Sequence, residues 1–278
     1  MQRDRRVHLC PVRSRSDKGI LGGCSVVEIK VLGASGSGVR GHSLPSLLID
    51  GRILLDAGGI ADSLDLAAQE RIEYVFVTHA HLDHVRDIPF LAENVSAARR
   101  VRPVIVFARR EVIADIRKHI LNKKIWPDFT TIPNEAKPIM VLESMKGAVR
   151  IDGFLVSPYG VTHTVPATGF LVQKDGKNLF YTGDTGPTRK TWKRLRGRRL
   201  DCLIMEISYP DSLKGLALKT GHLSPSLFLE ELSHIEPKPQ RVFVTHVKTR
   251  YRMEIEKEVK AAGLETVHIL DGGEIIRI

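Results

Sequence analysis

The chain has 278 residues, of which 42% are hydrophobic and 27% are charged, the composition of a globular protein with an ample core. No apolar run approaches the roughly 18 residues that a membrane span needs, so we expect no membrane partner. The three scattered cysteines argue against a disulfide framework and a cysteine-rich zinc site, and they favour a cytoplasmic protein. A net charge of +10 favours anionic substrates or polyanions, although a solvated cationic face would give the same value.

Basic residues concentrate in two segments. Residues 1–30 carry seven lysines or arginines against three acids, and residues 189–199 carry seven basic residues and no acid. We interpret residues 1–25 as a flexible basic extension, or as the product of a start codon placed too far upstream. Leu21–Cys24 resembles a lipoprotein cleavage box, but charged residues stand where a secretory signal needs an apolar segment of roughly 7–15 residues.

The first half of the chain alternates short strands with helices. A glycine-serine segment, Gly33–Gly38, indicates a turn after the first strand, and Asp50-Gly51 is a hairpin signal between the next two. The pattern predicts strands over 26–32, 46–49, 53–55, 74–77 and 104–108, and helices near 63–69, over 87–99 and over 110–121.

The segment Thr78–His84 is the most distinctive part of the sequence. It follows the apolar strand Tyr74–Val77 and holds four potential metal ligands within six positions. Burying such a cluster without a cation is costly, whereas a bound metal ion explains it. The sequence therefore predicts a metal site at the edge of a sheet, with the candidate ligands His79, His81, Asp83 and His84.

The second half repeats this style. The pattern predicts strands over 139–142, 148–151, 154–157, 168–173, 178–182, 202–207 and 242–245, helices over 188–196, 224–233 and 251–262, and a final strand pair near 267–277. There is no linker-like segment after residue 25. We therefore expect a single domain over residues 26–278, in which two sheets carry helices on their outer faces.

Four more polar residues stand where sheet-built sites collect their ligands. His163, Asp184 and His246 follow predicted strands, and His222 precedes a predicted helix. A lone histidine is more often structural, and the segment around Asp184 is also typical of a turn. Their number and order beside the first cluster favour the interpretation as ligands.

The order of these residues resembles that of the metallo-β-lactamase superfamily over about residues 26–278. The resemblance implies an α/β fold, a four-layer αβ/βα sandwich with a two-metal site between its sheets, and a supporting role for Asp56. It assigns His79, His81 and His163 to one metal ion, Asp83, His84 and His246 to the second, and Asp184 to both. Imidazole and carboxylate ligands suit zinc, which we expect first, with manganese or iron as alternatives.

A narrower resemblance is to the class II cyclic-nucleotide phosphodiesterases. It rests on Thr78–His84, Trp126–Thr130, His163–Ala167, Gly183–Thr188 and Gly221–Pro225, with Ser224 where that family frequently has threonine. This resemblance implies hydrolysis of 3′,5′-cyclic AMP or GMP to the 5′-nucleotide by a hydroxide that bridges the metal ions.

The departing 3′-oxygen needs a proton, and we expect His222 to donate it, with Glu206 orienting the imidazole. The arrangement is similar to that of the tRNA 3′-processing endonucleases of the superfamily, in which a glutamate at a strand end supports a histidine at a helix start. The candidate catalytic residues are Asp83, Asp184, Glu206 and His222.

Another metal-dependent hydrolase of the metallo-β-lactamase fold is one alternative to this prediction, and two further functions compete with it. One is an RNA or DNA phosphodiesterase of the tRNA 3′-processing type, which the positive charge favours. The other is a degenerate scaffold or nucleic-acid-binding protein, against which the complete set of ligands argues. We expect a small anionic phosphodiester as the partner, nucleic acid as the less favoured one, and an architecture compatible with a homodimer.

Overall fold

The computed structural model describes residues 26–98, 102–264 and 266–278, and the predicted extension over residues 1–25 lies outside them. Over the described residues the chain forms two seven-stranded sheets. The first contains β1 (Glu28–Gly33), β2 (Ser46–Ile49), β3 (Ile53–Leu55), β4 (Tyr74–Phe76), β5 (Val104–Ala108), β6 (Met140–Ser144) and β14 (Ile275–Arg277). The second contains β7 (Val149–Ile151), β8 (Phe154–Gly160), β9 (Thr168–Lys174), β10 (Lys177–Tyr181), β11 (Cys202–Glu206), β12 (Val242–Thr245) and β13 (His268–Ile269).

Each sheet is mixed. The first has the order β14-β1-β2-β3-β4-β5-β6, with antiparallel pairs from β14 to β3 and parallel pairs from β3 to β6. The second has the order β13-β12-β11-β10-β9-β8-β7, with parallel pairs from β13 to β10 and antiparallel pairs beyond. The parallel halves have the crossover helices that parallel strands require.

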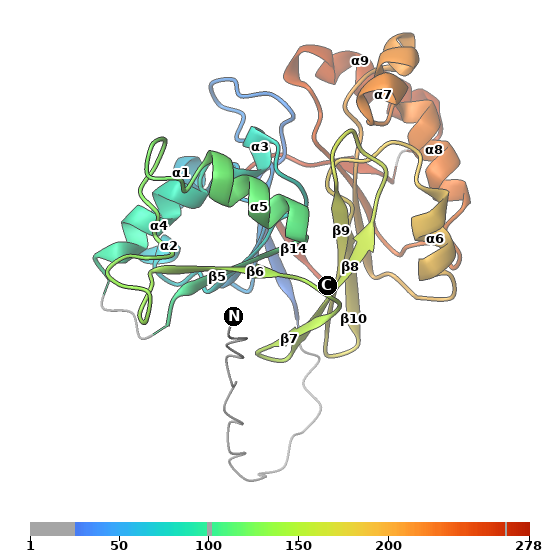
Figure 1. The fold of residues 1–278 in the computed structure, drawn as a ribbon. Coiled ribbons are helices and arrows are strands. Elements are labelled where there is room, and N and C mark those ends of the chain that lie inside the picture. The colour runs from blue at the N-terminus through green and yellow to red at the C-terminus, as the bar shows by residue number, and fades with distance from the viewer. Residues whose placement is uncertain (1–25, 99–101, 265) are drawn as a thin grey trace.

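Helices cover the outer face of each sheet (Figure 1). The first sheet carries α1 (Ile60–Ser63), α2 (Leu66–Gln69), α3 (Leu82–Val85), α4 (Ile88–Ser96) and α5 (Arg110–His119). The second carries α6 (Arg189–Leu195), α7 (Lys214–Thr220), α8 (Pro225–Ser233) and α9 (Arg252–Ala261), with the short 3-10 turns Asp211–Leu213 and Thr249–Tyr251. None of the helices in the described part of the chain is long and apolar enough to cross a membrane.

Three hydrophobic clusters separate the layers, and strand alternation explains them. In β2, Leu47 and Ile49 point into the cluster between the two sheets, whereas Leu48 points into the cluster beneath the first set of helices. A third cluster joins the second sheet to α6, α8 and α9 and contains the buried Trp192 and Phe228. Strands that are buried on both faces need apolar residues at consecutive positions, as their sequences have.

The architecture confirms the predicted αβ/βα sandwich. The two strands predicted near 267–277 are present as β13 and β14, but they do not pair with each other. β13 pairs with β12 and β14 pairs with β1, so the last two strands lie in different sheets. The helix predicted near 63–69 is two single turns, because Leu64 is extended and Asp65 caps α2. The helix α7 was not predicted; it contains a glycine and buries only Ala217.

Candidate metal centre

The cluster at residues 78–84 lies directly after β4, and part of it is helical. His81 is the residue before α3, so Asp83 and His84 stand on a single helical turn rather than in a loop. The structure also places His163 after β8, Asp184 after β10 and His246 after β12. These strand ends meet at one edge of the sandwich, where sheet-built sites are found.

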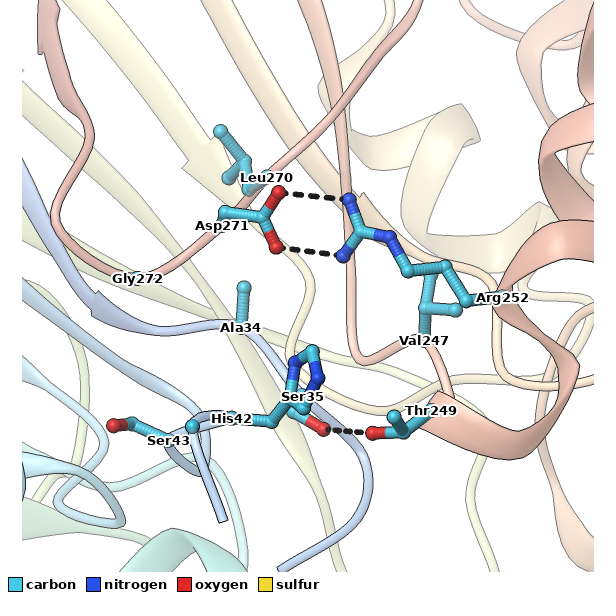
Figure 2. A pocket seen from close by; sticks show the side chains of 11 residues that line it. Ala34, Ser35, His42, Ser43, Val247, Thr249, Arg252, Leu270, Asp271 and Gly272 are labelled. Atoms are coloured by element: carbon cyan, nitrogen blue, oxygen red, sulfur yellow. Dashed lines mark hydrogen bonds and ion pairs between the residues drawn. The ribbon is translucent and has the colours of Figure 1, made fainter. Parts of the chain in front are cut away.

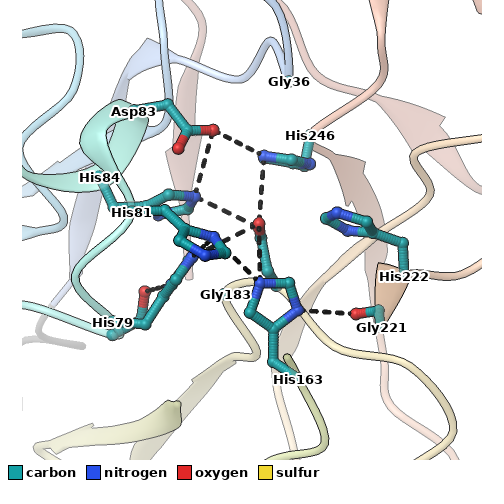
Figure 3. A network of polar contacts seen from close by, with 12 residues as sticks. Gly36, His79, His81, Asp83, His84, His163, Gly183, Gly221, His222 and His246 are labelled. Atoms are coloured by element: carbon teal, nitrogen blue, oxygen red, sulfur yellow. Dashed lines mark hydrogen bonds and ion pairs between the residues drawn. The ribbon is translucent and has the colours of Figure 1, made fainter. Parts of the chain in front are cut away.

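The predicted ligands form two groups that share one carboxylate (Figure 3). In each group the potential ligand atoms lie within 4.8 Å of one another. Asp184 Oδ2 is 3.6 Å from His79 Nε2 and 3.3 Å from His246 Nε2, so it reaches both groups. The first group is His79, His81, His163 and Asp184, and the second is Asp83, His84, Asp184 and His246.

Two buried polar atoms in these groups lack a hydrogen-bond partner among the described residues. They are His84 Nε2 and Asp184 Oδ1, which lie 3.3 Å apart on buried side chains. Buried polar atoms without partners are rare in native proteins because each costs free energy. A divalent cation would satisfy both, and nitrogen with oxygen donors suits zinc, manganese or iron. The residues therefore fit two divalent ions.

The protonation states of His79, His163 and Asp184 suit a metal. Burial lowers the pKa of His79 well below its usual value, and His84 lowers it further. Burial likewise lowers the pKa of His163. For Asp184 burial acts in the opposite direction, but His246 and His84 outweigh it and hold the pKa of that carboxyl well below its usual range. Neutral imidazoles and an ionised carboxylate are the forms that bind metal ions. At His84 burial lowers the pKa, but Asp184 and Asp56 outweigh it and raise the pKa well above its usual value, so metal binding there would release a proton.

Hydrogen bonds select which nitrogen of His163 and of His84 is free. The His163 Nδ1–H group donates to the Gly221 carbonyl at 2.8 Å, which leaves Nε2 with its lone pair. His84 Nδ1 is 2.8 Å from Asp56 Oδ2, which leaves its Nε2 free in the same way. Such partners fix the tautomer and ring orientation of metal-binding histidines.

Asp56 organises the segment that carries the histidines. Its carboxylate is fully buried and accepts hydrogen bonds from the Thr78 backbone N–H at 2.8 Å and from the Tyr181 hydroxyl at 2.9 Å. The Thr78 hydroxyl donates to both carboxylate oxygens at 3.0 Å. Asp56 therefore ties β4, β10 and His84 together, which is the supporting position that the superfamily resemblance implies.

Replacing Asp56 by asparagine is expected to weaken metal affinity by about 10–100-fold. The amide keeps the size of the carboxylate and tolerates the positive φ of 59° at this position. It cannot accept all the hydrogen bonds of Asp56 or orient His84 as a carboxylate does. Competition with a chromogenic chelator would measure the affinity, with the exposed Glu93→Gln as control. Equal affinities of D56N and wild type would contradict this role.

His222 and Glu206 form a buried pair beside the second group. The His222 Nδ1–H group donates to Glu206 Oε1 at 2.7 Å, which leaves Nε2 free. Burial lowers the pKa of His222, but the charge and hydrogen bond of Glu206 outweigh this and raise it overall. The His222 ring lies between those of His163 and His246, with centroids 5.1 and 5.3 Å away.

Ser208 joins this pair to the metal-ligand groups, and sequence reasoning missed it. Its hydroxyl donates to Glu206 Oε2 at 2.7 Å and lies 2.8 Å from His246 Nδ1. A hydroxyl has one hydrogen to donate, so Ser208 accepts from His246 Nδ1–H and leaves His246 Nε2 free. The only signal in the sequence was its place two residues after Glu206, at the end of a buried strand.

Two glycines allow the close packing of this centre. A Cβ at Gly36 would lie 2.5 Å from the His246 carbonyl oxygen and 2.9 Å from His246 Nδ1. Gly183 has a φ of +59°, and a Cβ there would lie 2.7 Å from Thr78 Cγ2. Figure 3 shows both glycines beside the ligands. Any side chain at either position would displace a residue of the centre.

A polar cavity of about 160 Å³ lies beside the Gly33–Gly38 segment (Figure 2). Its charged groups already have partners, since Arg252 pairs with Asp271 through two hydrogen bonds of 2.6 and 2.8 Å. The hydroxyls of Ser35 and Thr249 are 3.1 Å apart. The Gly36 N–H donates to the Val247 carbonyl, so the segment serves as a structural turn here.

The first part of the basic segment 189–199 forms α6. Three arginines of this segment lie near acidic side chains of the same protein. Arg199 lies 3.1 Å from Asp201, and longer ion pairs of 3.9 and 3.7 Å join Arg189 to Glu230 and Arg196 to Glu236. Arg194 stacks over the Tyr159 ring. Part of the local charge is therefore balanced within the protein.

Comparison with known proteins identifies the family. The model of the beta-lactamase superfamily domain matches residues 52–247. The chain is 27% identical to a probable 3′,5′-cyclic-nucleotide phosphodiesterase of Yersinia pestis, over 81% of this chain and 79% of that protein. It is 24% identical to a ribonuclease Z of Archaeoglobus fulgidus, over 81% of this chain and 88% of that protein.

Solved structures agree on the fold. Unliganded yeast PDE1 is similar with a TM-score of 0.78 and 19% identity, over 91% of this chain and 99% of that one. The short form of human tRNase Z is similar with a TM-score of 0.67 and 18% identity, over 90% and 98% of the two chains. These likenesses show the fold, and the match to the family model shows that the chain belongs to the metallo-β-lactamase superfamily.

Proposed function

We propose that the protein is a two-metal phosphodiesterase that hydrolyses 3′,5′-cyclic nucleotides to 5′-nucleotides. The observation that supports this most directly is the convergence of seven imidazole and carboxylate side chains on two sites that share Asp184. When bound, two divalent ions stabilise the charge on a phosphoryl group and activate water. The likeness to a probable cyclic-nucleotide phosphodiesterase supports the substrate class.

The protein's own residues would position these ions and the substrate phosphate. Zinc is the first candidate, with manganese and iron as alternatives. Asp83, whose side chain is 30% exposed, is one of the more open ligands. His79, His81, His163 and Asp184 would hold one ion, and Asp83, His84, His246 and Asp184 would hold the other.

His222 would protonate the departing 3′-oxygen. Its Nδ1–H is held by Glu206, so Nε2 is the atom that can deliver a proton. Glu206 is kept in place by the Thr185 N–H at 2.9 Å and by the Ser208 hydroxyl at 2.7 Å. We assign Glu206 a positioning role, because it acts through His222 and does not need to touch the substrate.

The direct test is turnover of cyclic nucleotides by the zinc- or manganese-loaded protein. We expect 3′,5′-cyclic AMP or GMP to give 5′-AMP or 5′-GMP, and a chelator to stop the reaction. Liquid chromatography separates the 5′- and 3′-products, and elemental analysis gives the metal content per chain. Protein with two bound ions that turns over neither nucleotide would refute the proposal.

A nuclease of the ribonuclease Z type is the second candidate. It is favoured by the archaeal ribonuclease Z relatives and by the net charge of +10. The same metal-loaded protein should then process the 3′ end of a tRNA precursor, with binding that weakens steeply as salt increases. Cleavage of the precursor without cyclic-nucleotide turnover would replace the first proposal by this one.

A further inference from the structure

A cavity of about 440 Å³ lies against His81, beside the first group of ligands. Three segments line it: residues 80–85 around the start of α3, one face of α5, and Val165 with Pro166. Its volume lies within the roughly 300–1,000 Å³ that is typical of ligand pockets. Because His81 borders both the cavity and the first ligand group, a molecule whose phosphate is held there can extend into the cavity.

The walls of this cavity suit a neutral, flat, largely apolar group. Leu82, Val112 and Ile116 are among the side chains that line it. Leu82 is 68% exposed, so its apolar side chain is accessible to a molecule bound in the cavity. The described residues that line the cavity include no lysine or arginine. A second phosphate would therefore find no counter-charge there, whereas an aromatic base would find apolar surface.

One carboxylate at the cavity is free to select that base. Asp115 and His119 lie one turn apart on α5, and both are exposed at the cavity. In the described part of the chain, no hydrogen bond or ion pair engages Asp115. One turn earlier, Glu111 lies 3.5 Å from Arg109 and does not line the cavity.

We propose that this cavity is the base-binding subsite of the enzyme and that Asp115 makes it prefer guanine to adenine. The inference rests on the proposed function. An ionised carboxylate only accepts hydrogen bonds, and guanine presents two adjacent donors, N1–H and the 2-amino group. Adenine presents a single amino donor beside the N1 lone pair, which a carboxylate oxygen repels. Cyclic GMP is therefore the preferred substrate.

Calorimetric titration of the zinc-loaded protein with 5′-GMP and with 5′-AMP tests the subsite without any need for turnover. We expect wild type to bind 5′-GMP at least about five-fold more tightly, the low end of what a two-bond contact to a base contributes. D115N should lose or reverse this preference, because its amide also donates and can pair with adenine. D115A should bring the ratio of the two dissociation constants close to one.

The neighbouring residues supply the controls. E111Q removes the same charge from the same helix outside the cavity and should leave the ratio unchanged. L82A should weaken both nucleotides by a similar factor, because it removes apolar surface and no hydrogen bond. A wild-type ratio of one, or a ratio that D115N does not change, would overturn the inference.

Turnover separates this inference from the function on which it rests. If cyclic GMP and cyclic AMP are hydrolysed with equal kcat/KM by wild type and by D115N, the subsite is refuted and the phosphodiesterase stands. If neither is hydrolysed while bis(p-nitrophenyl) phosphate is, the proposed function fails. The nucleotide titrations then still decide whether Asp115 selects guanine.

Discussion

Replacing Asp184 by alanine is expected to reduce phosphodiester hydrolysis by more than about 10³-fold. Both ligand groups lose the one carboxylate they share, and each single charge-stabilising contact in an active site is already worth about 10²–10³ in rate. The measurement is kcat/KM for cyclic GMP and for bis(p-nitrophenyl) phosphate. Both substrates should lose rate together, because Asp184 would act on the phosphate, which they have in common.

The same variant should also lose the stabilisation that metal gives to the fold. A ligand that binds only the native state at 1,000 times its Kd adds about 4 kcal/mol to the free energy of unfolding. Wild-type protein should therefore melt at a higher temperature with zinc than with chelator, and D184A should show little of this shift.

A buried carboxylate elsewhere in the fold provides the control for Asp184. Glu231 is buried, accepts hydrogen bonds from Thr188 N–H and Trp192 Nε1, and belongs to neither ligand group. E231Q should lower the melting temperature yet keep the zinc-dependent shift. A D184A protein that retained both the shift and the activity would refute the shared-ligand assignment.

The local sequence predicted those features that depend on local pattern. Thr78–His84 stands out because a dense set of ligands follows a buried strand, and β2, β3, β5 and β12 have the predicted bounds because each is a short apolar run. The partners of the last two strands could not be read in this way, because β14 joins β1 from the other end of the chain, while β13 joins the preceding strand β12 across α9.

The polar atoms that surround the ligands were harder to foresee. Ser208 gains its role only when β11 and β12 lie side by side, so that one hydroxyl reaches both Glu206 and His246. Asp115 sits on an ordinary charged helix, and only the fold places it at a cavity beside His81. In both cases the residue type is unremarkable, and its meaning comes from contacts between distant segments.

Replacing His222 by alanine is expected to slow hydrolysis of cyclic GMP by about 10²–10⁴-fold, the usual contribution of a general acid. Hydrolysis of bis(p-nitrophenyl) phosphate should fall by less than about ten-fold, because nitrophenolate departs without needing a proton. The measurement compares the loss of hydrolysis rate for cyclic GMP with the loss for bis(p-nitrophenyl) phosphate. A merely structural role for His222 would slow both substrates equally, and that result would remove it as proton donor.

The variant should keep its fold and its ligands. Without His222, Glu206 still accepts hydrogen bonds from Thr185 N–H, Ser208 Oγ and Leu223 N–H, so its charge is not left without partners. The zinc-dependent rise in melting temperature should therefore survive in H222A, unlike in D184A. Its loss would mean that His222 supports the ligands rather than the leaving group.

Replacing Glu206 by glutamine tests its positioning role. E206Q keeps one oxygen to accept from His222 Nδ1 but loses the charge that favours the protonated imidazole. It should show the same dependence on the leaving group as H222A, with a smaller loss. The double variant should lose little beyond H222A alone, since Glu206 acts through His222. Additive losses would show that Glu206 acts on the reaction by another route.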